Sequence, residues 1–476
     1  MDLAELSANF LVSKSFRVVS LLGFLPAVTL LLVSGSEVNP LWAQSETPVV
    51  ISSSPTPVGS GARAAGVANA FIAVADDATA ASWNPGGLVQ LERPEVSAVG
   101  SFFIRTDDTN DVTQTRDGIL EDYVIGDDAT TSLDLNFLSI AYPFQFLGRN
   151  MTVSLNYQRK FDFNRDFDFE YTQSREDLVI YRDFAIEQEG GLHALTPAIA
   201  FEIVPTFSVG VAFNVWGSEF FKDTAWRSQK TLHRTRVDPN SGTVQSAATV
   251  VETQEFDDFS GWNATLGFLW NVTSYLNLGA VVNLPFRAEL RVRQRIENTE
   301  LPLDDLQRLE TFEQDIEMLF PVSYGLGVAL RPIDPLTFSL DYMRVDWEDF
   351  VYRDEAGNQY SVITSQPAVK DGDADVGASN TVRFGVEYLF IWPNLVWPVR
   401  AGFFYDPEPA AGGTDDYFGF TVGTGITFKW VTLDLAYVFK FGNDIKPSNI
   451  TDIRNLDTAR ADVTQHTILL STVARF

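Results

Sequence analysis

From Pro94 to the end of the chain, apolar and polar residues alternate with a period of two, and turn-forming residues interrupt the alternation. This pattern is typical of β-strands that present one face to apolar surroundings and the other to polar ones. It predicts fourteen strands, at about residues 95–105, 132–143, 151–171, 179–203, 207–218, 250–270, 275–293, 311–330, 336–352, 381–391, 397–405, 417–429, 431–441 and 466–476. The predicted fold class is therefore all-β.

The lengths of the predicted connections carry further information. Those after even-numbered strands are short, as at 204–206 and 271–274, whereas most of those after odd-numbered strands are long, as at 106–131 and 219–249. An even number of strands joined by alternating short turns and long loops is typical of an antiparallel transmembrane β-barrel of the bacterial outer membrane. Both termini would then lie at the short-turn, periplasmic end.

The two faces of single strands favour the same interpretation. Phe418, Phe420 and Val422 share one face of a predicted strand, and Gly419 and Thr421 share the other. A tilted strand crosses a bilayer in about 9–11 residues, which is the length of these runs. A soluble β-sandwich also alternates and is the alternative, but it would need neither an export signal nor aromatic residues at the strand ends.

The start of the chain reads as a secretory signal peptide. Lys14 and Arg17 precede the apolar stretch 18–33, and Ala43 is a small residue before a polar segment. This order of basic, apolar and small residues predicts cleavage after Ala43. A retained membrane anchor is the alternative, although the apolar stretch is short for a spanning helix.

The predicted domains are thus a signal peptide at 1–43, an N-terminal lead and small-residue segment at 44–93, and the barrel at 94–476. Residues 59–91 are dominated by Ala and Gly, which allow close packing of the backbone in a confined space. The chain ends on Phe476, an aromatic residue on an alternating strand, as is typical of barrels that are recognised for membrane insertion.

Composition excludes several classes of function. The net charge is −29, there is no cysteine, and there are three histidines. These counts exclude disulfides and thiolate sites and argue against a nucleic-acid partner, which requires a basic face. No catalytic or nucleotide-binding motif has the necessary spacing, so we expect no enzyme activity, no cofactor and no metal site. The acidic residues fall in the long loops, where they either keep the loops soluble or bind divalent cations that bridge lipopolysaccharide.

Several segments carry a resemblance to a known family. The strings 61–66 (GARAAG), 73–80 (AVADDATA) and 83–88 (WNPGGL) resemble the N-terminal hatch of the FadL-type outer-membrane transporters. The blocks 320–347 and 383–388 resemble two of that family's hairpins. The family's Asn-Pro-Ala motif has Gly86 at its third position here.

This resemblance implies a fourteen-stranded barrel whose lumen is plugged by a hatch. The function implied is passive uptake of long-chain fatty acids or other hydrophobic molecules, by a monomer in contact with outer-membrane lipid and lipopolysaccharide. Asn84, Pro85 and Gly86 would form the gate, because proline fixes its own φ and glycine permits conformations closed to other residues. A barrel that acts as a surface scaffold or secretion-system component is the alternative. Fatty acids, alkanes and aromatic hydrocarbons all remain open as substrates.

Two expectations concern single strands. Arg287, Arg291 and Arg293 are an even number of residues from Asn283, so in one regular strand they would lie on the same face as Asn283. This predicts that they face the lumen. There they would pair with acidic residues of the next strand or receive a substrate carboxylate. The third strand, 151–171, contains no Gly or Pro and alternates without a break, so the lateral opening found in the family's third strand is not expected here.

Overall fold

The computed structural model describes residues 60–116, 118–218, 224–301, 308–364, 367–368, 376–445 and 459–476. The expected signal peptide, 1–43, and the first part of the next segment, 44–59, lie outside the described residues. Among the residues described, no helix is long and apolar enough to cross a membrane.

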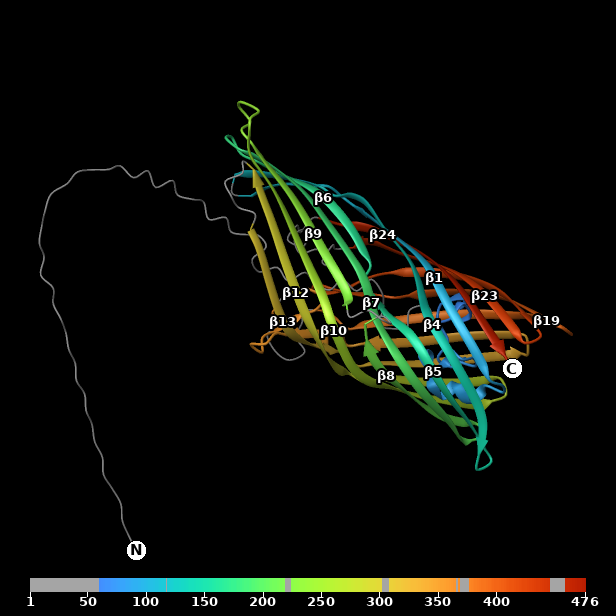
Figure 1. Cartoon of the computed structure of the whole chain (residues 1–476). Coiled ribbons are helices and arrows are strands. Elements are labelled where there is room, and N and C mark those ends of the chain that lie inside the picture. Colours follow the sequence, from blue (N-terminus) through green and yellow to red (C-terminus); the bar gives the residue numbers. More distant parts are fainter. Residues whose placement is uncertain are drawn as a thin grey trace, which may run out of the picture. The chain divides into compact units, whose positions relative to one another are not determined.

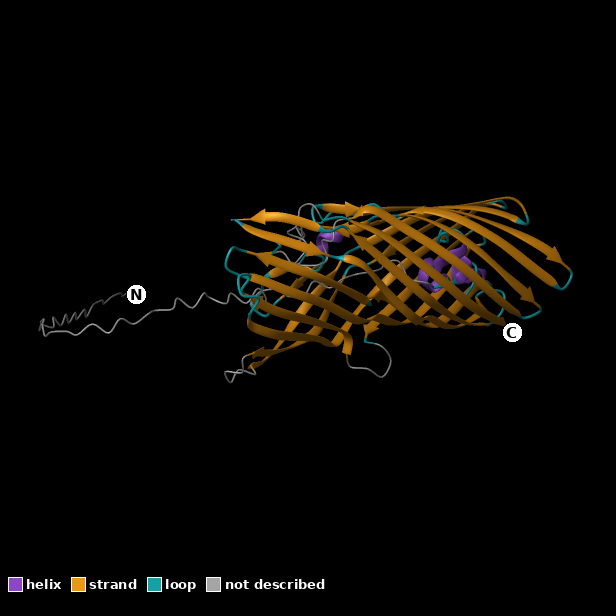
Figure 2. Cartoon of the chain, turned by 90° about the horizontal axis from the view of Figure 1, so that it is seen from above, coloured by secondary structure: helices purple, strands orange, loops and turns teal. Residues whose placement is uncertain are grey.

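The wall is a closed barrel of fourteen antiparallel strands, several of which are interrupted part-way (Figures 1 and 2). In chain order these strands are β1 (Glu95–Thr109), β4 (Gly126–Phe146), β5 (Arg149–Asp162) with β6 (Arg165–Ser174), β7 (Val179–Val204), β8 (Phe207–Gly217) with β9 (Thr224–Val237), β10 (Val244–Thr273), β11 (Leu276–Asn283) with β12 (Phe286–Leu301), β13 (Arg308–Phe320) with β14 (Ser323–Ile333), β15 (Leu336–Val345), β18 (Ser379–Trp392), β19 (Leu395–Tyr405), β22 (Phe418–Phe428), β23 (Val431–Ile445) and β24 (Ala461–Arg475). Each overlaps one predicted strand, so the all-β barrel prediction is confirmed.

Shorter strands lie at the end of the wall that carries the long loops. They are β2 (Val112–Arg116), β3 (Ile119–Val124), β16 (Val351–Arg353), β17 (Gln359–Ser361), β20 (Glu408–Ala410) and β21 (Gly413–Asp415). The opposite end is closed by tight hairpins such as Leu147–Gly148, where both residues have positive φ, at 52° and 73°. Such turns match the twist of the strands that they join.

The first and last strands close the barrel. Glu95 lies opposite Arg475, whose Nε donates a 2.7 Å hydrogen bond to the Glu95 carboxylate. The backbone N–H of Phe476 donates to the carbonyl of Pro94 at 3.0 Å. The terminal aromatic residue therefore lies at the seam, beside Trp430, with ring centroids 6.1 Å apart.

A belt of large apolar side chains covers the outer face of the wall. Leu326 on β14, Val422 on β22 and Leu470 on β24 are each more than half exposed. A continuous exposed apolar surface of this kind is found where a barrel meets lipid. On β10 to β14 the belt ends near Leu284, and beyond it the outward positions of β12 are charged.

The small-residue segment, called the N-terminal segment from here on, lies inside the barrel. It forms the short helices α1 (Ala62–Gly66), α2 (Ala80–Trp83) and η1 (Pro85–Gln90), which Figure 2 shows within the ring of strands. Nearly all of its residues in the described range 60–91 are buried, and Val67, Phe71, Trp83 and Leu88 share one apolar cluster with wall alanines.

Glycines on the inner face of the wall make room for this segment. A Cβ added at Gly279 would lie 2.5 Å from the carbonyl oxygen of Ile72, and one at Gly402 would lie 2.6 Å from the Cβ of Ala68. Six further wall glycines approach the segment in the same way, and we call the set the glycine belt: Gly210, Gly267, Gly279, Gly325, Gly327, Gly385, Gly402 and Gly423. Because glycine has no side chain, backbone packs on backbone there.

Candidate functional site

Aromatic side chains from many strands converge inside the barrel, on the long-loop side of the N-terminal segment. They and the aliphatic residues among them are almost completely buried, and we call them the lumen cluster: Phe161, Phe163, Leu192, Trp216, Trp226, Phe256, Phe259, Leu290, Ile316, Met318, Phe320, Trp347 and Phe350. An apolar lining with few polar groups is typical of sites that bind hydrophobic molecules.

Stacked rings form the centre of this cluster. Phe286 stacks on Phe320 with centroids 4.4 Å apart, and on Trp216 at 5.0 Å. Trp226 stacks on Phe256 at 4.2 Å. The indole N–H of Trp216 donates to Asn263 at 2.8 Å, so its polar atom is satisfied while its ring faces the cluster. Flat, rigid rings of this kind offer a large contact area to an apolar ligand.

The third strand is interrupted beside this cluster, and the expectation of an unbroken strand was wrong. β5 ends at Asp162 and β6 starts at Arg165, with a bulge between Arg159 and Phe161. Across from it, Gly190 of β7 has a φ of +119°, which accommodates the bend. The glycine that permits the bend is thus on the neighbouring strand and not in the third strand itself.

Beside the interruption, two neighbouring strands of the wall are not joined by backbone hydrogen bonds, and we call this unpaired stretch the slot. β4 pairs with β5 only as far as Phe137 opposite Gln158, and the next backbone pairing is between β3 and β6, at Val124 opposite Glu170. Between these pairs, the backbones of β4 and of the β5–β6 strand, both described along this stretch, are not paired with each other. Phe163 of the lumen cluster lies between β5 and β6, next to this unpaired stretch.

Side chains bridge the slot instead of backbone. Arg159 reaches Asp134 of β4 at 2.8 Å and Asp162 of its own strand at 2.8 Å. Further along, the backbone N–H of Asp166 donates to Thr130 Oγ1 at 2.9 Å. Side-chain bridges can separate without breaking a β-ladder, so the two strands can part here while the rest of the wall stays paired.

The structure places Arg287, Arg291 and Arg293 on the outer face, which corrects the expectation that they face the lumen. Between them Leu290 is 3% exposed and belongs to the lumen cluster. The reason is Pro285: β11 ends at Asn283 and β12 begins at Phe286, so two residues bulge and the alternation changes by one position. A shift of one residue moves every later side chain to the other face.

Pro321 shifts the next strand in the same way, between β13 and β14. The cross-strand pairs therefore persist, but outside the barrel: Arg291 Nε lies 3.1 Å from Asp315 and 3.2 Å from Glu313. Arg293 pairs with Asp257 of β10. Because these arginines lie on the outer face, their side chains do not point into the lumen, and Arg291 and Arg293 already have acidic partners.

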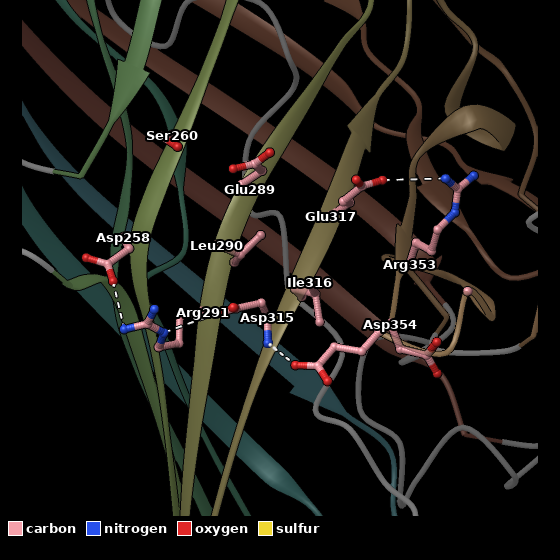
Figure 3. Close-up of a pocket in the computed structure, with 12 residues that line it drawn as sticks. Asp258, Ser260, Glu289, Leu290, Arg291, Asp315, Ile316, Glu317, Arg353 and Asp354 are labelled. Atoms are coloured by element: carbon pink, nitrogen blue, oxygen red, sulfur yellow. Dashed lines mark hydrogen bonds and ion pairs between the residues drawn. The ribbon is translucent and has the colours of Figure 1, made fainter.

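A hollow of about 650 Å³ lies on this charged outer side of β10, β12 and β13 (Figure 3). Its lining includes Asp258, Glu289, Arg291, Asp315 and Glu317. Charged walls suit neither a fatty chain nor a hydrocarbon. Among the described residues, no group of three His, Asp or Glu side chains is arranged to hold a metal ion.

Asn84, Pro85 and Gly86 lie against the wall at the glycine belt. Asn84 Nδ2 donates to the carbonyl of Ile72 at 2.8 Å and to that of Phe268 on β10 at 2.9 Å. Its Oδ1 accepts from the N–H of Gly86 at 3.0 Å. The completely buried amide therefore joins two parts of the N-terminal segment to each other and to the barrel.

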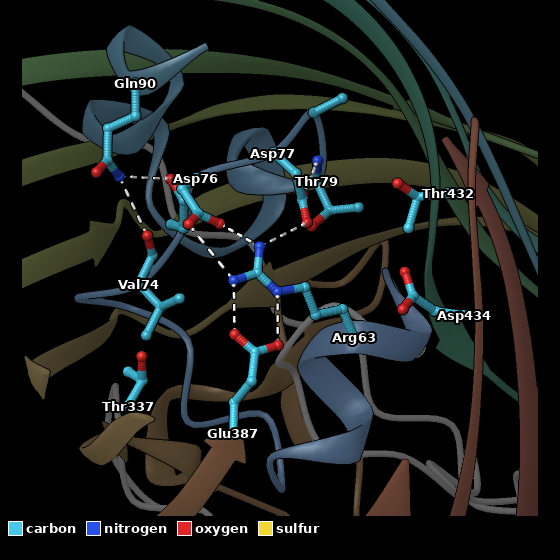
Figure 4. A network of polar contacts seen from close by, with 12 residues as sticks. Arg63, Val74, Asp76, Asp77, Thr79, Gln90, Thr337, Glu387, Thr432 and Asp434 are labelled. Atoms are coloured by element: carbon cyan, nitrogen blue, oxygen red, sulfur yellow. Dashed lines mark hydrogen bonds and ion pairs between the residues drawn. The ribbon is translucent and has the colours of Figure 1, made fainter. Parts of the chain in front are cut away.

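An ionic network holds the other side of the segment (Figure 4). Arg63 of α1 pairs with Asp76 in its own segment and with Glu387 of β18, at 3.0 Å and 3.1 Å. Glu387 also accepts from Arg400 Nε at 2.6 Å, and Arg400 reaches Asp434 at 2.7 Å. Buried charges are tolerated only when they are paired in this way.

Asp341 of β15 makes a third attachment. Its Oδ2 accepts from the backbone N–H groups of Phe71 and Ile72, at 2.7 Å and 2.8 Å. The N-terminal segment is thus fixed to the wall by an amide, an arginine and a carboxylate on three sides.

Comparison with known proteins identifies the family to which this barrel belongs. The family model of the outer membrane protein transport proteins (OMPP1/FadL/TodX) matches residues 58–476. The chain belongs to this family. No curated protein matches it.

Two solved structures resemble this FadL-family chain. A Pseudomonas aeruginosa FadL homologue matches with a TM-score of 0.56 at 15% identity, covering 90% of this chain and 100% of that one. The monoaromatic hydrocarbon channel CymD matches with a TM-score of 0.51 at 15% identity, covering 88% and 98%. At this identity the likeness concerns the fold alone.

Sequence reasoning missed the lumen cluster of this family member. The available signal was the pair of prolines: Pro285 precedes Phe286 and Pro321 follows Phe320. Proline inside a predicted strand indicates a bulge, and a bulge changes which face the later residues occupy.

Proposed function

We propose that this outer-membrane barrel is a passive route for hydrophobic molecules, with the lumen cluster as the binding site and the slot as the lateral exit. The observation that carries the proposal is that the two adjoin: Phe161 and Phe163 belong to the cluster, and Phe161 lies just before the interruption of the third strand and Phe163 within it. A solute bound to these rings lies next to an unpaired part of the wall.

A lateral exit fits the physical chemistry of the solute. An apolar molecule that leaves through the slot passes from aromatic side chains towards the apolar outer belt, where Leu133 and Leu135 of β4 are exposed. It never has to cross water or the charged outer layer, both of which are unfavourable for apolar surface.

The N-terminal segment is proposed as the gate. The cluster side chains pack against one another, so a ligand enters only if something moves. Asn84 and the Arg63 network hold the segment through a small number of polar contacts, and these can exchange more easily than the ladders of the wall.

The substrates proposed are long-chain fatty acids or other hydrophobic molecules, including aromatic hydrocarbons. The many stacked rings of the lumen cluster support an apolar ligand without selecting one class. The solved structure CymD, which this chain resembles, is described as a monoaromatic hydrocarbon channel.

The test is uptake of a labelled hydrocarbon and a labelled fatty acid by cells that carry the protein or a cross-linked form of it. The natural chain has no cysteine, so two can be introduced cleanly. Ser82→Cys with Gln158→Cys, whose side chains are 2.9 Å apart, joins the segment to β5 when a short bifunctional thiol reagent is added. Thr427→Cys with Thr432→Cys, within the wall, is the matched control.

We expect uptake to stop with the first cross-link and to continue with the second. Uptake that is unaffected by both would exclude the segment as the gate. Absence of uptake by the unmodified protein, together with stable co-purification of a secreted partner, would support the scaffold alternative.

A further inference from the structure

Two layers of polar side chains flank the lumen cluster along the barrel axis. The lower layer lies between the cluster and the N-terminal segment: on β8, Trp216 of the cluster is on one side of Asn214 and Gly210 of the glycine belt is on the other. Its members are polar residues on the inner face of neighbouring strands: Thr196, Asn214, Asn263, Thr265, Asn283 and Ser323.

Hydrogen bonds join the lower layer from strand to strand. Thr196 Oγ1 donates to Asn214 Oδ1 at 2.9 Å, and Asn214 Nδ2 donates to Asn263 Oδ1 at 2.9 Å. Thr265 Oγ1 donates to Asn283 Oδ1 at 2.6 Å. Asn283 Nδ2 then donates to the Ser323 hydroxyl at 2.9 Å. The layer is thus a continuous band of polar groups that satisfy one another.

The upper layer lies on the long-loop side of the cluster. Its side chains occupy the inward positions that follow Trp226 and Phe256 along β9 and β10, and the corresponding positions on β7 and β12: Gln188, Ser228, Gln254 and Gln294 in one cross-strand row, with Lys230 and Glu252 opposite each other beyond it. All of them except Gln294 are buried.

The upper layer is also held by hydrogen bonds. Glu252 Oε1 accepts from Gln254 Nε2 at 3.0 Å and from Gln294 Nε2 at 2.5 Å. Gln188 Nε2 donates to the carbonyl of Phe163 at 2.8 Å. An apolar chain pushed into either layer would separate such pairs. A buried polar group that loses its partner costs more free energy than a methylene group gains by burial.

The distance between the two layers sets a length. Gln188 and Thr196, one from each layer, are eight residues apart on the inner face of β7, with Leu192 of the cluster between them. At about 3.3 Å per residue and a strand tilt of about 40°, this is about 20 Å along the barrel axis. The polar side chains take about 2.5 Å at either end, half the spacing of inward rows, which leaves about 15 Å. Because staggered carbon–carbon bonds of about 1.5 Å advance a chain by about 1.3 Å each, about twelve carbons fit.

We infer that the two polar layers determine the specificity of the lumen cluster and limit its ligands to apolar molecules no longer than a chain of about twelve carbons. This inference rests on the proposed function and narrows its substrate class: compact hydrocarbons fit between the layers, and the tails of long-chain fatty acids do not.

The test is the binding of n-alkanes of increasing length, from hexane to octadecane. Purified full-length protein in detergent micelles is loaded with equimolar pairs of alkanes, and native mass spectrometry gives the ratio in which they remain bound. Partition of each alkane between water and protein-free micelles is measured separately, so that affinities refer to the alkane in water. We expect affinity to rise about fourfold per methylene group up to about dodecane and then to stop rising.

Two inner-face variants should move this limit. Gln254→Leu with Gln294→Leu makes one row of the upper layer apolar and should extend the limit by about 5 Å, or about four carbons. Ser228→Ala removes a buried hydroxyl that has no hydrogen-bond partner in the described part of the chain, so it should fold even if the double variant does not, and it should shift the limit less in the same direction. Gln229→Leu, at the adjacent outward position of β9, is the matched control and should leave the limit unchanged.

Affinity that keeps rising through octadecane in the parent would overturn the inference. So would a limit that no correctly folded inner-face variant moves, or one that Gln229→Leu moves equally. Failure of the proposed function has a different result, because then no alkane binds to the parent above the level of protein-free micelles.

Discussion

Phe286 of β12 lies directly opposite Phe320 of β13, and their rings stack with an interplanar angle of 10°. Each phenylalanine is adjacent to a proline, Pro285 or Pro321, that ends the neighbouring strand segment. The two prolines change the alternation of both strands at the same level. As a result the stacked rings face the lumen while the charged residues beyond them face outward.

Substitution of Arg291 should have little effect. Its partners Asp315 and Glu313 are well exposed, and exposed ion pairs contribute little to stability because water screens them. We expect Arg291→Gln to unfold in urea at the same concentration as the parent and to leave uptake unchanged. A loss of uptake in a correctly folded variant would restore a ligand role for this residue.

Glu387→Gln should weaken the attachment of the N-terminal segment. The substitution leaves Arg63 and Arg400 buried without their shared carboxylate, which costs about 3–5 kcal/mol when a buried pair is broken. Urea unfolding should measure the loss, and hydrogen exchange should show faster exchange in α1. Glu297→Gln, whose partner Arg295 is exposed, is the control and should unfold like the parent.

Enlarging a glycine of the belt should displace the segment. A Cβ at Gly267 would lie 2.6 Å from Pro85 Cδ and still closer to Asn84 Oδ1. Gly267→Ala should therefore destabilise the protein by about 1–3 kcal/mol through overpacking. At Gly217 the nearest atom to an added Cβ is 3.9 Å away, so Gly217→Ala should be tolerated. Equal melting temperatures for the two variants would show that the N-terminal segment moves to make room for the added methyl group without any loss of stability.

A covalent bridge across the slot should block release of the ligand. Asp134→Cys with Arg159→Cys places two thiols where the 2.8 Å ion pair now joins β4 to β5. With a short thiol cross-linker, uptake of labelled hydrocarbon should fall while binding to the purified protein persists. The same pair without the reagent serves as the comparison. Undiminished uptake in the cross-linked cells would mean that the solute leaves by another path.

The sequence alone determined the strands and the membrane-facing surface. Alternation with a period of two is a local property, and the large apolar residues of the predicted strands, such as Val422 and Leu470, are indeed exposed on the outer face. The short turns and the Ala/Gly-rich segment were readable for the same reason. The ion pairing between Arg291 and Asp315 was also anticipated, because neighbouring strands bring such residues together.

Only the tertiary structure decided which face the residues beyond Pro285 and Pro321 occupy, because a bulge changes the parity of everything after it. It also decided the lumen cluster, whose rings come from strands far apart in the chain, and the slot, which depends on Gly190 of β7 and on pairing that β4 does not make. The glycine belt shows the same limit. Its members are ordinary inward positions in the sequence, and their role appears only when the N-terminal segment is packed against them.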